Sequence, residues 1–179
     1  KPPPGGSHTA ESHLAHGMLD AVVDRTQLRD HVAVLLDLLG QQYQLTSTRK
    51  GETEKSRDAP QPAWDSVKLA RHSDRPTSLD YIGRIITDFV ELHGDRAHGD
   101  DRAVVCGLGH LGGQTVMVVG QERGRTGDPV SRNEGRTSPE GFRKAQRAMR
   151  LAAKFELPLV TLIDTPGAYS SLEAEERGL

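Results

Sequence analysis

A short apolar run followed by a proline–glycine break constrains the fold of this chain more than any other feature. Residues 159–163 read LVTLI, a run that is apolar and rich in β-branched side chains. This pattern is typical of a strand buried on both faces. The strand is expected to end at Asp164, because Pro166 cannot donate a ladder hydrogen bond and Gly167 accepts any turn geometry. Residues 138–155 read as a helix, so the order is helix, strand and loop.

A loop at the carboxyl end of a buried strand is where open α/β sheets place their ligands. Gly167, Ala168 and Tyr169 lie in this loop and are therefore candidates for contact with substrate. The letters DTPG also follow a buried strand in GTP-binding proteins, but that interpretation requires a phosphate loop, GxxxxGK followed by Ser or Thr. The sequence contains no such loop. An ordinary strand-to-loop turn remains the simpler alternative.

Longer strings surround this loop. They read AWDSVKLARHSDRPTSLDYI at residues 63–82, SPEGFRKAQRAMRLAAKFELP at residues 138–158, and LIDTPGAY…AEERG at residues 162–178. Together these strings resemble the α subunit of the bacterial acetyl-CoA carboxylase carboxyltransferase. The resemblance implies an α/β fold of the crotonase-like superfamily, built of stacked ββα units. Residues 63–179 would form the amino-terminal part of such a domain.

The first forty residues have a resemblance of their own. The string PPGGSHTAESHLAHGMLDAVVDRTQLRDHVAVLLDLL is similar to the carboxyl end of the β subunit of the same family, although a generic helix–strand–helix is the alternative. Residues 41–62 are polar and charged and end in prolines, which is typical of a linker. The sequence therefore predicts a piece of a fused β–α polypeptide, with a β-like tail over residues 1–40, a linker over residues 41–62 and an α-like part over residues 63–179.

Local patterns in the β-like tail predict two helices and a strand. A short helix is expected over residues 9–16, with Ser7 or Thr9 as its cap. LDAVV, residues 19–23, favours a short strand, and Asp24 begins a second helix. The apolar face of this second helix is predicted to consist of Leu28, Val32, Leu35, Leu36 and Leu39, which follow the helical period.

Three elements are predicted early in the α-like part. Thr77 or Ser78 begins a helix that runs to Leu92. Its apolar stripe is formed by Leu79, Ile82, Ile85, Ile86 and Phe89. Residues 103–108 and 115–120 follow as strands of a hairpin that turns at a pair of glycines, Gly112 and Gly113.

Two motifs in this hairpin have a plain explanation. The letters GxGxxG occur at Gly107, Gly109 and Gly112, but a dinucleotide site requires a helix after the motif, and here a strand follows. Cys106 stands in the apolar run AVVCGL and is interpreted as a small buried hydrophobic residue. Neither motif is expected to carry chemistry.

Ser138 is predicted to cap the helix that precedes the apolar strand, with Pro139 at its first position. Its face toward the sheet is predicted to consist of Phe142, Ala145, Met149, Ala152 and Ala153. Its cations, of which most are expected on a solvated surface, are Arg143, Lys144, Arg147, Arg150 and Lys154. A tight helix–sheet contact through small residues is therefore expected.

A basic loop, QERGRTGDPVSRNEGRT, occupies residues 121–137. The family has a comparable loop ending in RN-x-G, which Arg132, Asn133 and Gly135 match, whereas Glu134 and Arg136 stand where the family usually has apolar residues. Coenzyme A carries three phosphate groups, and guanidinium groups in a glycine-bearing loop can orient toward such oxyanions. Arg123, Arg125, Arg132 and Arg136 are therefore predicted to bind the acyl-CoA phosphates. The alternative is a solvated basic loop, or one that pairs with acidic residues of a partner.

A second polar loop, ELHGDRAHGDDRAV, invites a metal interpretation. Its candidate ligands are His93, Asp95, His98, Asp100 and Asp101. Aspartate and glycine are equally the residues that a turn requires. The family resemblance implies no metal at this position, so no metal site is predicted.

The resemblance implies an enzyme that moves a carboxyl group from carboxybiotin on a biotin carboxyl carrier protein to acetyl-CoA, giving malonyl-CoA for fatty acid synthesis. Its partners would be that carrier protein and the remaining β and α parts, in an oligomer. With 23 Lys and Arg against 25 Asp and Glu, the net charge favours neither nucleic acid nor a membrane surface. The sequence shows no run of apolar residues long enough for a membrane span and no signal peptide, so a soluble cytoplasmic protein is expected.

The catalytic groups are expected outside this chain, because the glycine turns that hold the enolate and the biotin oxygen in the family would lie upstream and downstream of it. The piece alone is therefore predicted to be inactive. Ser170 and Ser171 stand where the family has proline and glycine, and Glu173 stands where a further glycine is expected. These departures leave a second hypothesis open, a noncatalytic interaction or regulatory module that keeps the fold.

Overall fold

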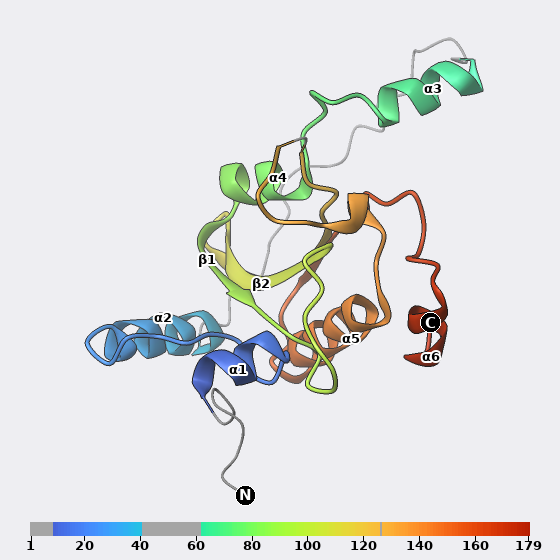
Figure 1. The fold of residues 1–179 in the computed structure, drawn as a ribbon. Coiled ribbons are helices and arrows are strands. Elements are labelled where there is room, and N and C mark those ends of the chain that lie inside the picture. Colours follow the sequence, from blue (N-terminus) through green and yellow to red (C-terminus); the bar gives the residue numbers. More distant parts are fainter. Residues whose placement is uncertain (1–8, 41–61, 126) are drawn as a thin grey trace, which may run out of the picture.

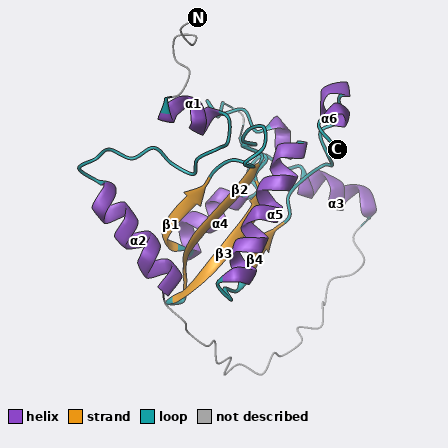
Figure 2. Cartoon of the chain, turned by 90° about the horizontal axis from the view of Figure 1, so that it is seen from below, coloured by secondary structure: helices purple, strands orange, loops and turns teal. Residues whose placement is uncertain are grey.

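The computed structural model describes residues 9–40, 62–125 and 127–179. A four-stranded sheet in the order β1-β2-β3-β4 forms its centre, with helices on both faces (Figures 1 and 2). The strands are β1 (Thr87–Leu92), β2 (Val104–Leu111), β3 (Gln114–Gln121) and β4 (Leu159–Leu162). The α/β class predicted from the sequence is confirmed. None of the helices in these ranges is long and apolar enough to cross a bilayer.

The sheet combines an antiparallel and a parallel part. β1 pairs antiparallel with β2, and β2 pairs antiparallel with β3, through the predicted hairpin at Gly112 and Gly113. Both glycines have positive φ, +60° and +84°, which a tight hairpin turn requires. β4 runs parallel to β3. The connection between them contains α5 (Pro139–Lys154), as a parallel crossover demands.

Each face of the sheet carries its own apolar core. On one face, α5 contributes Ala148 and Ala152 to a cluster with Val104, Cys106 and Met117 of the central strands. On the other face, α4 (Ser78–Ile85) and the residue after it contribute Ile82 and Ile86, which pack on Val105, Val116 and Val118. Burial raises the pKa of Cys106 to about 12. Its thiol is therefore protonated and inert, as the sequence predicted.

The predicted helix from residue 77 to Leu92 is wrong in its second half. The helix ends at Ile85, and the chain continues as β1, which is hydrogen-bonded to β2. A register shift lies between Thr87 and Val90, where Asp88 has a φ of +53°. The predicted apolar stripe follows the helical period past Ile85, but pairing with the β2 backbone makes residues 87–92 a strand.

The β-like tail forms two helices but no strand. Helix α1 (Ala10–Ala15) is capped by Thr9, as predicted. Residues 19–23 are irregular. Asp24 accepts hydrogen bonds from the Thr26 backbone and hydroxyl, and helix α2 (Leu28–Gly40) begins only after this turn. The strand prediction failed because no other strand of the described residues lies beside this run.

The apolar face of α2 is rotated from the predicted one. Leu38 is fully buried, and Leu35 and Leu39 pack around it on the sheet cluster. Leu28, Val32 and Leu36 are 50%, 42% and 65% exposed, so these three members of the predicted face do not join the core. The helix touches the sheet mainly through its last turns.

Helix α5 also turns a different face to the sheet. Lys144, Ala148 and Ala152 are buried, whereas Phe142 and Met149 are exposed. The solvated surface predicted for most of the α5 cations therefore does not extend to Lys144. Its ammonium group is drawn inward because it donates to the Val104 carbonyl at 2.8 Å and lies 2.8 Å from an Asp100 carboxylate oxygen.

Strand β4 is an edge strand in the described chain. It pairs with β3, and its side chains alternate between exposed and half-buried. Ile163, just after it, is 82% exposed. The prediction of a strand is confirmed, but burial on both faces is wrong for this chain. Helix α3 (Ala63–Ala70) begins where the α-like resemblance begins, and the linker predicted over residues 41–62 falls almost wholly outside the described residues.

Candidate binding groove

The basic loop after β3 begins at a buried carboxylate. Glu122 is 1% exposed, and its oxygens accept hydrogen bonds from the backbone N–H of Leu79 and of Gly124, both at 2.8 Å. The Ser78 hydroxyl donates to the Gln121 carbonyl at 2.6 Å. The start of α4 and the start of the loop are therefore fixed to each other.

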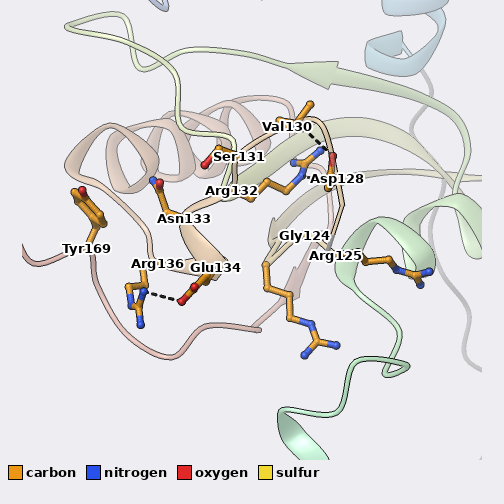
Figure 3. Close-up of a pocket in the computed structure, with 11 residues that line it drawn as sticks. Gly124, Arg125, Asp128, Val130, Ser131, Arg132, Asn133, Glu134, Arg136 and Tyr169 are labelled. Atoms are coloured by element: carbon orange, nitrogen blue, oxygen red, sulfur yellow. Dashed lines mark hydrogen bonds and ion pairs between the residues drawn. The ribbon is translucent and has the colours of Figure 1, made fainter.

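The basic loop lines one side of each of two adjoining pockets. The first, of about 360 Å³, is lined by Arg123, Gly124, Arg125, Asp128, Val130, Ser131, Arg132, Asn133, Glu134, Arg136 and Tyr169 (Figure 3). The second, of about 860 Å³, is lined by Val67, Ala70, Arg71, Ser73, Arg123, Gly124, Arg125, Glu134, Arg136, Asp164, Thr165 and Pro166. Because the two share the arginines of the loop, we refer to them together as the basic groove.

Two arginines of the basic groove hold protein backbone. The Arg132 side chain is 13% exposed, and its Nη1 donates to the Arg102 carbonyl at 2.8 Å. Nη2 of Arg123 donates to the carbonyls of His72 and Arg75, at 2.9 and 3.0 Å. These two guanidinium groups position the loop against the segments before β2 and after α3.

The other two arginines are exposed. The side chains of Arg125 and Arg136 are 58% and 47% exposed. Arg125 pairs with Asp80. Arg136 pairs with Glu134 at 2.8 Å, as Figure 3 shows. Exposed ion pairs contribute about 0–1 kcal/mol, because water screens them. Both groups can therefore exchange their partner for another anion at low cost.

A left-handed turn joins the basic loop to the loop after β4. Asn133, Glu134 and Gly135 have φ values of +48°, +54° and +79° in succession. A Cβ on Gly135 would lie 3.0 Å from the Asp164 carbonyl oxygen and 3.1 Å from the Arg123 Cβ. Glycine is therefore required here both by conformation and by space. Asn133 and Glu134 are held in a conformation that costs energy, as residues near functional sites often are.

The loop after β4 is attached to the start of α5. Thr137 forms a parallel bridge with Ala168, and the Tyr169 N–H donates to the Thr137 carbonyl at 2.9 Å. The Thr165 hydroxyl donates to the Gly167 carbonyl at 2.8 Å. Gly167 has a φ of +143°, and a Cβ there would meet nothing within 4 Å. The glycine is thus required by its backbone conformation, and its surroundings are open.

The structure brings most of the predicted substrate-binding residues together. Arg123, Arg125, Arg132 and Tyr169 line the same hollow. Gly167 and Ala168 follow the lining residues Asp164, Thr165 and Pro166 but do not themselves line it.

The carboxylate that connects these segments, that of Asp164, was not predicted from the sequence. The Asp164 carboxylate pairs with Arg75, and its second oxygen lies 3.7 Å from Nε of Arg123. Asp164 therefore connects the turn after α3, the basic loop and the end of β4. The sequence shows only that an acidic residue follows an apolar strand. This pattern does not indicate which arginines the carboxylate contacts.

Comparison with known proteins agrees with this geometry. The family model "Acetyl co-enzyme A carboxylase carboxyltransferase-like" matches residues 10–179. The chain belongs to this family. A fused "Acetyl-coenzyme A carboxylase carboxyl transferase subunits beta/alpha" from Salinispora tropica is 46% identical over 185 residues, which is 98% of this chain and 33% of that protein. A separate α subunit from Nitrosomonas eutropha is 51% identical over 144 residues, 80% of this chain and 44% of that protein.

Solved structures confirm the mixed α/β fold. A single-chain, multi-domain long-chain acyl-CoA carboxylase matches with a TM-score of 0.65 at 20% identity, over 98% of this chain and 16% of that one. Transcarboxylase 12S matches with a TM-score of 0.64 at 19% identity, over 94% and 31%. The chain spans about a third of the length of the fused relatives that it matches.

Ser171, one of the residues predicted to depart from the family pattern, has a local structural role. Ser171 is the N-cap of helix α6 (Leu172–Glu176), and its side chain accepts a hydrogen bond from the Ala174 N–H at 3.1 Å. Beyond the helix, Arg177 lies 2.9 Å from Glu140, at the start of α5. Ser171 therefore begins a helix that is anchored to α5.

The polar loop between β1 and β2 uses its carboxylates internally. Asp95 accepts from the N–H groups of Ala97 and His98 at 2.8 Å, and Asp101 accepts from the Ser138 N–H at 2.8 Å. Burial opposes the charge of Asp100, but the hydrogen bond from His93 and the nearby Lys144 hold its pKa well below the usual range. Within the described ranges, no group of three or more His, Cys, Asp or Glu is placed to hold a metal ion.

Proposed function

We propose that the complete polypeptide is a carboxyltransferase that moves a carboxyl group from carboxybiotin on a carrier protein to acetyl-CoA. In this proposal, residues 63–179 are the first part of its α-like domain and residues 1–40 are the tail of its β-like domain. Family membership supports the reaction class, and the fused relatives support the division. The product would be malonyl-CoA, used for fatty acid synthesis, and the working state would be a cytoplasmic oligomer of β-like and α-like parts.

The basic groove would bind the nucleotide end of the acyl-CoA. The observation that carries this assignment is the exposure of Arg125 and Arg136 inside the groove. A phosphate oxygen could take the place of the Glu134 carboxylate. Arg136 would then keep a charge-assisted hydrogen bond, and no further charged group would have to be buried. Arg123 and Arg132 would act indirectly, by holding the loop in place.

The net reaction exchanges two groups. The methyl carbon of the thioester loses a proton and gains the carboxyl group, while the biotin ring nitrogen loses the carboxyl group and gains a proton. Negative charge develops on the thioester oxygen and on the biotin oxygen, and each requires hydrogen-bond donors aimed at it. We infer that glycine turns in the rest of the polypeptide supply these donors. The loop at Gly167 and Tyr169 would border the cleft, and the piece alone would not turn over.

The test is a kinetic comparison in the full-length polypeptide. Arg136→Ala and Arg125→Ala should each raise KM for acetyl-CoA about three- to tenfold, as loss of an exposed charge-assisted contact does, with kcat unchanged. Arg84→Ala, which removes an exposed arginine of α4, is the matched control and should change neither constant. The effect should shrink at high salt. A thioester of 3′-dephospho-CoA should show a smaller effect if that phosphate is the partner.

Two outcomes would overturn parts of the proposal. If both groove variants kept the parent KM at low and at high salt, the arginines would have a structural role and the CoA phosphates would bind elsewhere. If the folded full-length protein bound acetyl-CoA but formed no malonyl-CoA from carboxybiotin, the noncatalytic module would be the correct interpretation.

A further inference from the structure

The four arginines of the basic loop each form an ion pair with a carboxylate. The pairs are Arg123 with Asp164, Arg125 with Asp80, Arg132 with Asp128 and Arg136 with Glu134. Three of these carboxylates also bind a second group, namely Arg75 for Asp164, the Thr77 N–H for Asp80 and the Val130 N–H for Asp128. Glu134 differs, because Arg136 is the one partner that its carboxylate has in the described part of the chain. Its ion pair therefore holds no other part of that structure in place.

The backbone fixes the Glu134 side chain in the basic groove. Glu134 and Arg136 line both pockets, and Figure 3 shows the two side chains directed toward each other. The turn that carries them is closed by two hydrogen bonds at 2.9 Å, from the Gly135 N–H to the Arg132 carbonyl and from the Arg136 N–H to the Asn133 carbonyl. Glu134 has a φ of +54°, a conformation that costs energy for a residue with a side chain. The turn therefore places a carboxylate on Arg136 from a backbone position that would suit glycine better.

A carboxylate held beside a cation on the same turn competes with any anion that approaches that cation. Its short tether gives it an effective concentration of roughly millimolar or more. A phosphomonoester carries a charge of about −1.5 to −2 at pH 7 and three acceptor oxygens, so it is a stronger ligand for a guanidinium group than a carboxylate is. In coenzyme A the pyrophosphate link consists of diesters of lower charge, and only the 3′-phosphate is a monoester. The 3′-phosphate is therefore the group of acyl-CoA that can best displace Glu134 from Arg136.

We propose that Arg136 is the 3′-phosphate subsite of the basic groove and that Glu134 is an internal ligand which the 3′-phosphate displaces. This inference rests on the proposed function, since it takes the groove to bind the nucleotide end of acyl-CoA. The displaced carboxylate belongs to a side chain that is already 78% exposed, so it passes into water. Arg136 gains a partner of higher charge in exchange. Glu134 therefore lowers the affinity of the groove for acyl-CoA by the strength of one exposed ion pair.

The test is isothermal titration calorimetry of the full-length polypeptide at low salt. Glu134→Gln should lower the Kd for acetyl-CoA about two- to fivefold, which is the range that the loss of an exposed ion pair allows. The Kd for acetyl-3′-dephospho-CoA should change by less than about twofold, because that ligand lacks the displacing group. Glu173→Gln is the matched control. Its side chain is also 78% exposed and pairs with an arginine, Arg177, but lies outside the basic groove, so both affinities should stay at the parent level.

Two further variants separate charge from backbone strain and from general repulsion. Glu134→Asn removes the charge with a residue that adopts positive φ more readily, so it should fold as the parent does and tighten acetyl-CoA binding as Glu134→Gln does. The double variant Arg136→Ala with Glu134→Gln should bind acetyl-CoA as Arg136→Ala alone does, because no cation remains to be freed. The urea midpoints of all these proteins should equal that of the parent, which shows that the affinities compare folded states.

The possible failures are distinguishable. If Arg136→Ala weakened acetyl-CoA binding but Glu134→Gln and Glu134→Asn bound as the parent does, the internal ligand would be refuted while the groove kept its proposed function. If Arg136→Ala bound acetyl-CoA as the parent does, the proposed function of the groove would fail first. Equal tightening of acetyl-CoA and acetyl-3′-dephospho-CoA would place another phosphate at Arg136 and overturn the subsite. A double variant that bound more tightly than Arg136→Ala would show that Glu134 acts by general repulsion and not by holding Arg136.

Discussion

The cations of α5 and the cations of the basic groove make the same kinds of pair in different surroundings. Lys144 is fully buried, and its ammonium group lies 2.8 Å from an Asp100 carboxylate that is itself 11% exposed. Arg136 is 47% exposed and pairs, also at 2.8 Å, with a Glu134 side chain that is 78% exposed. Because the two distances are equal, burial determines how easily each pair can be separated. The first pair cannot be opened without leaving a buried charge, and the second can be opened by any competing anion.

Arginines of both regions also differ in whether they donate to backbone carbonyls or to carboxylates. Arg147 of α5 donates to the carbonyls of His93 and Gly94, and so holds the β1–β2 connection. Arg132 of the basic loop behaves in the same way toward the Arg102 carbonyl. Arg125 of that loop has an exposed carboxylate pair instead. Neighbouring arginines therefore differ in their partners: those that donate to carbonyls hold the backbone, and those with exposed carboxylate pairs are the ones that we propose to bind an anion.

The largest effect should come from the buried pair. Lys144→Met should lower the free energy of unfolding by about 3–5 kcal/mol, because it leaves Asp100 buried without its cation. Urea denaturation measures the change, and Arg150→Met, on the exposed side of α5, should cost less than about 0.5 kcal/mol. The double variant Lys144→Met with Asp100→Asn should recover part of the loss. Equal stability of Lys144→Met and the parent would erase the contrast between the two regions.

An intermediate effect is expected from acid. The folded state lowers the pKa of Asp100, so its charged form stabilises the fold above the unfolded pKa of about 3.9, and this contribution is lost as the pH falls below that value. The parent should therefore lose more stability between pH 6 and pH 3 than Asp100→Asn does. We expect a difference of about 1 kcal/mol at pH 3, measured by urea denaturation at each pH. Parallel pH profiles of the two proteins would show that Asp100 gains nothing from its buried partners.

The smallest effects should separate two arginines of one loop. Arg132→Ala should cost about 1 kcal/mol of stability, because the Arg102 carbonyl and the loop lose a hydrogen bond. Arg136→Ala should change stability by less than about 0.5 kcal/mol. Thermal and urea unfolding of the two variants side by side give the comparison. Identical losses would mean that exposure does not distinguish the two roles.

Much of the fold could be predicted because its signals are local. The hairpin at Gly112 and Gly113, the start of α5 at Ser138 and Pro139, and the strand β4 each depend on a few adjacent residues, and all three are confirmed. The Ser138 hydroxyl, however, donates to Asp101 and makes no cap hydrogen bond. The helix predicted through Leu92 failed because the helical spacing of apolar residues continues past Ile85, whereas pairing with β2, which lies later in the chain, makes residues 87–92 a strand. The predicted face of α5 failed because most of its cations were assigned to solvent by residue type, whereas buried acceptors far along the chain determine the position of Lys144.

The basic groove was predictable in composition but not in roles. A loop with four arginines and several glycines indicates an anion site, and the RN-x-G string placed it in a family. The freedom of each arginine depends on partners such as the Arg102 and His72 carbonyls, which are distant in sequence. Asp164 was overlooked for the same reason, since its role depends on Arg75 and Arg123.

The exposed edge of β4 has a consequence for handling the chain by itself. The strand pairs with β3, its outer side presents backbone groups ready to pair, and Leu159 and Ile163 beside them are 43% and 82% exposed. An edge of this kind templates strand addition between molecules. Concentrated preparations of this chain will therefore self-associate through β4 into larger particles, and a lysine in place of the exposed Thr161 will slow that aggregation without reaching the core.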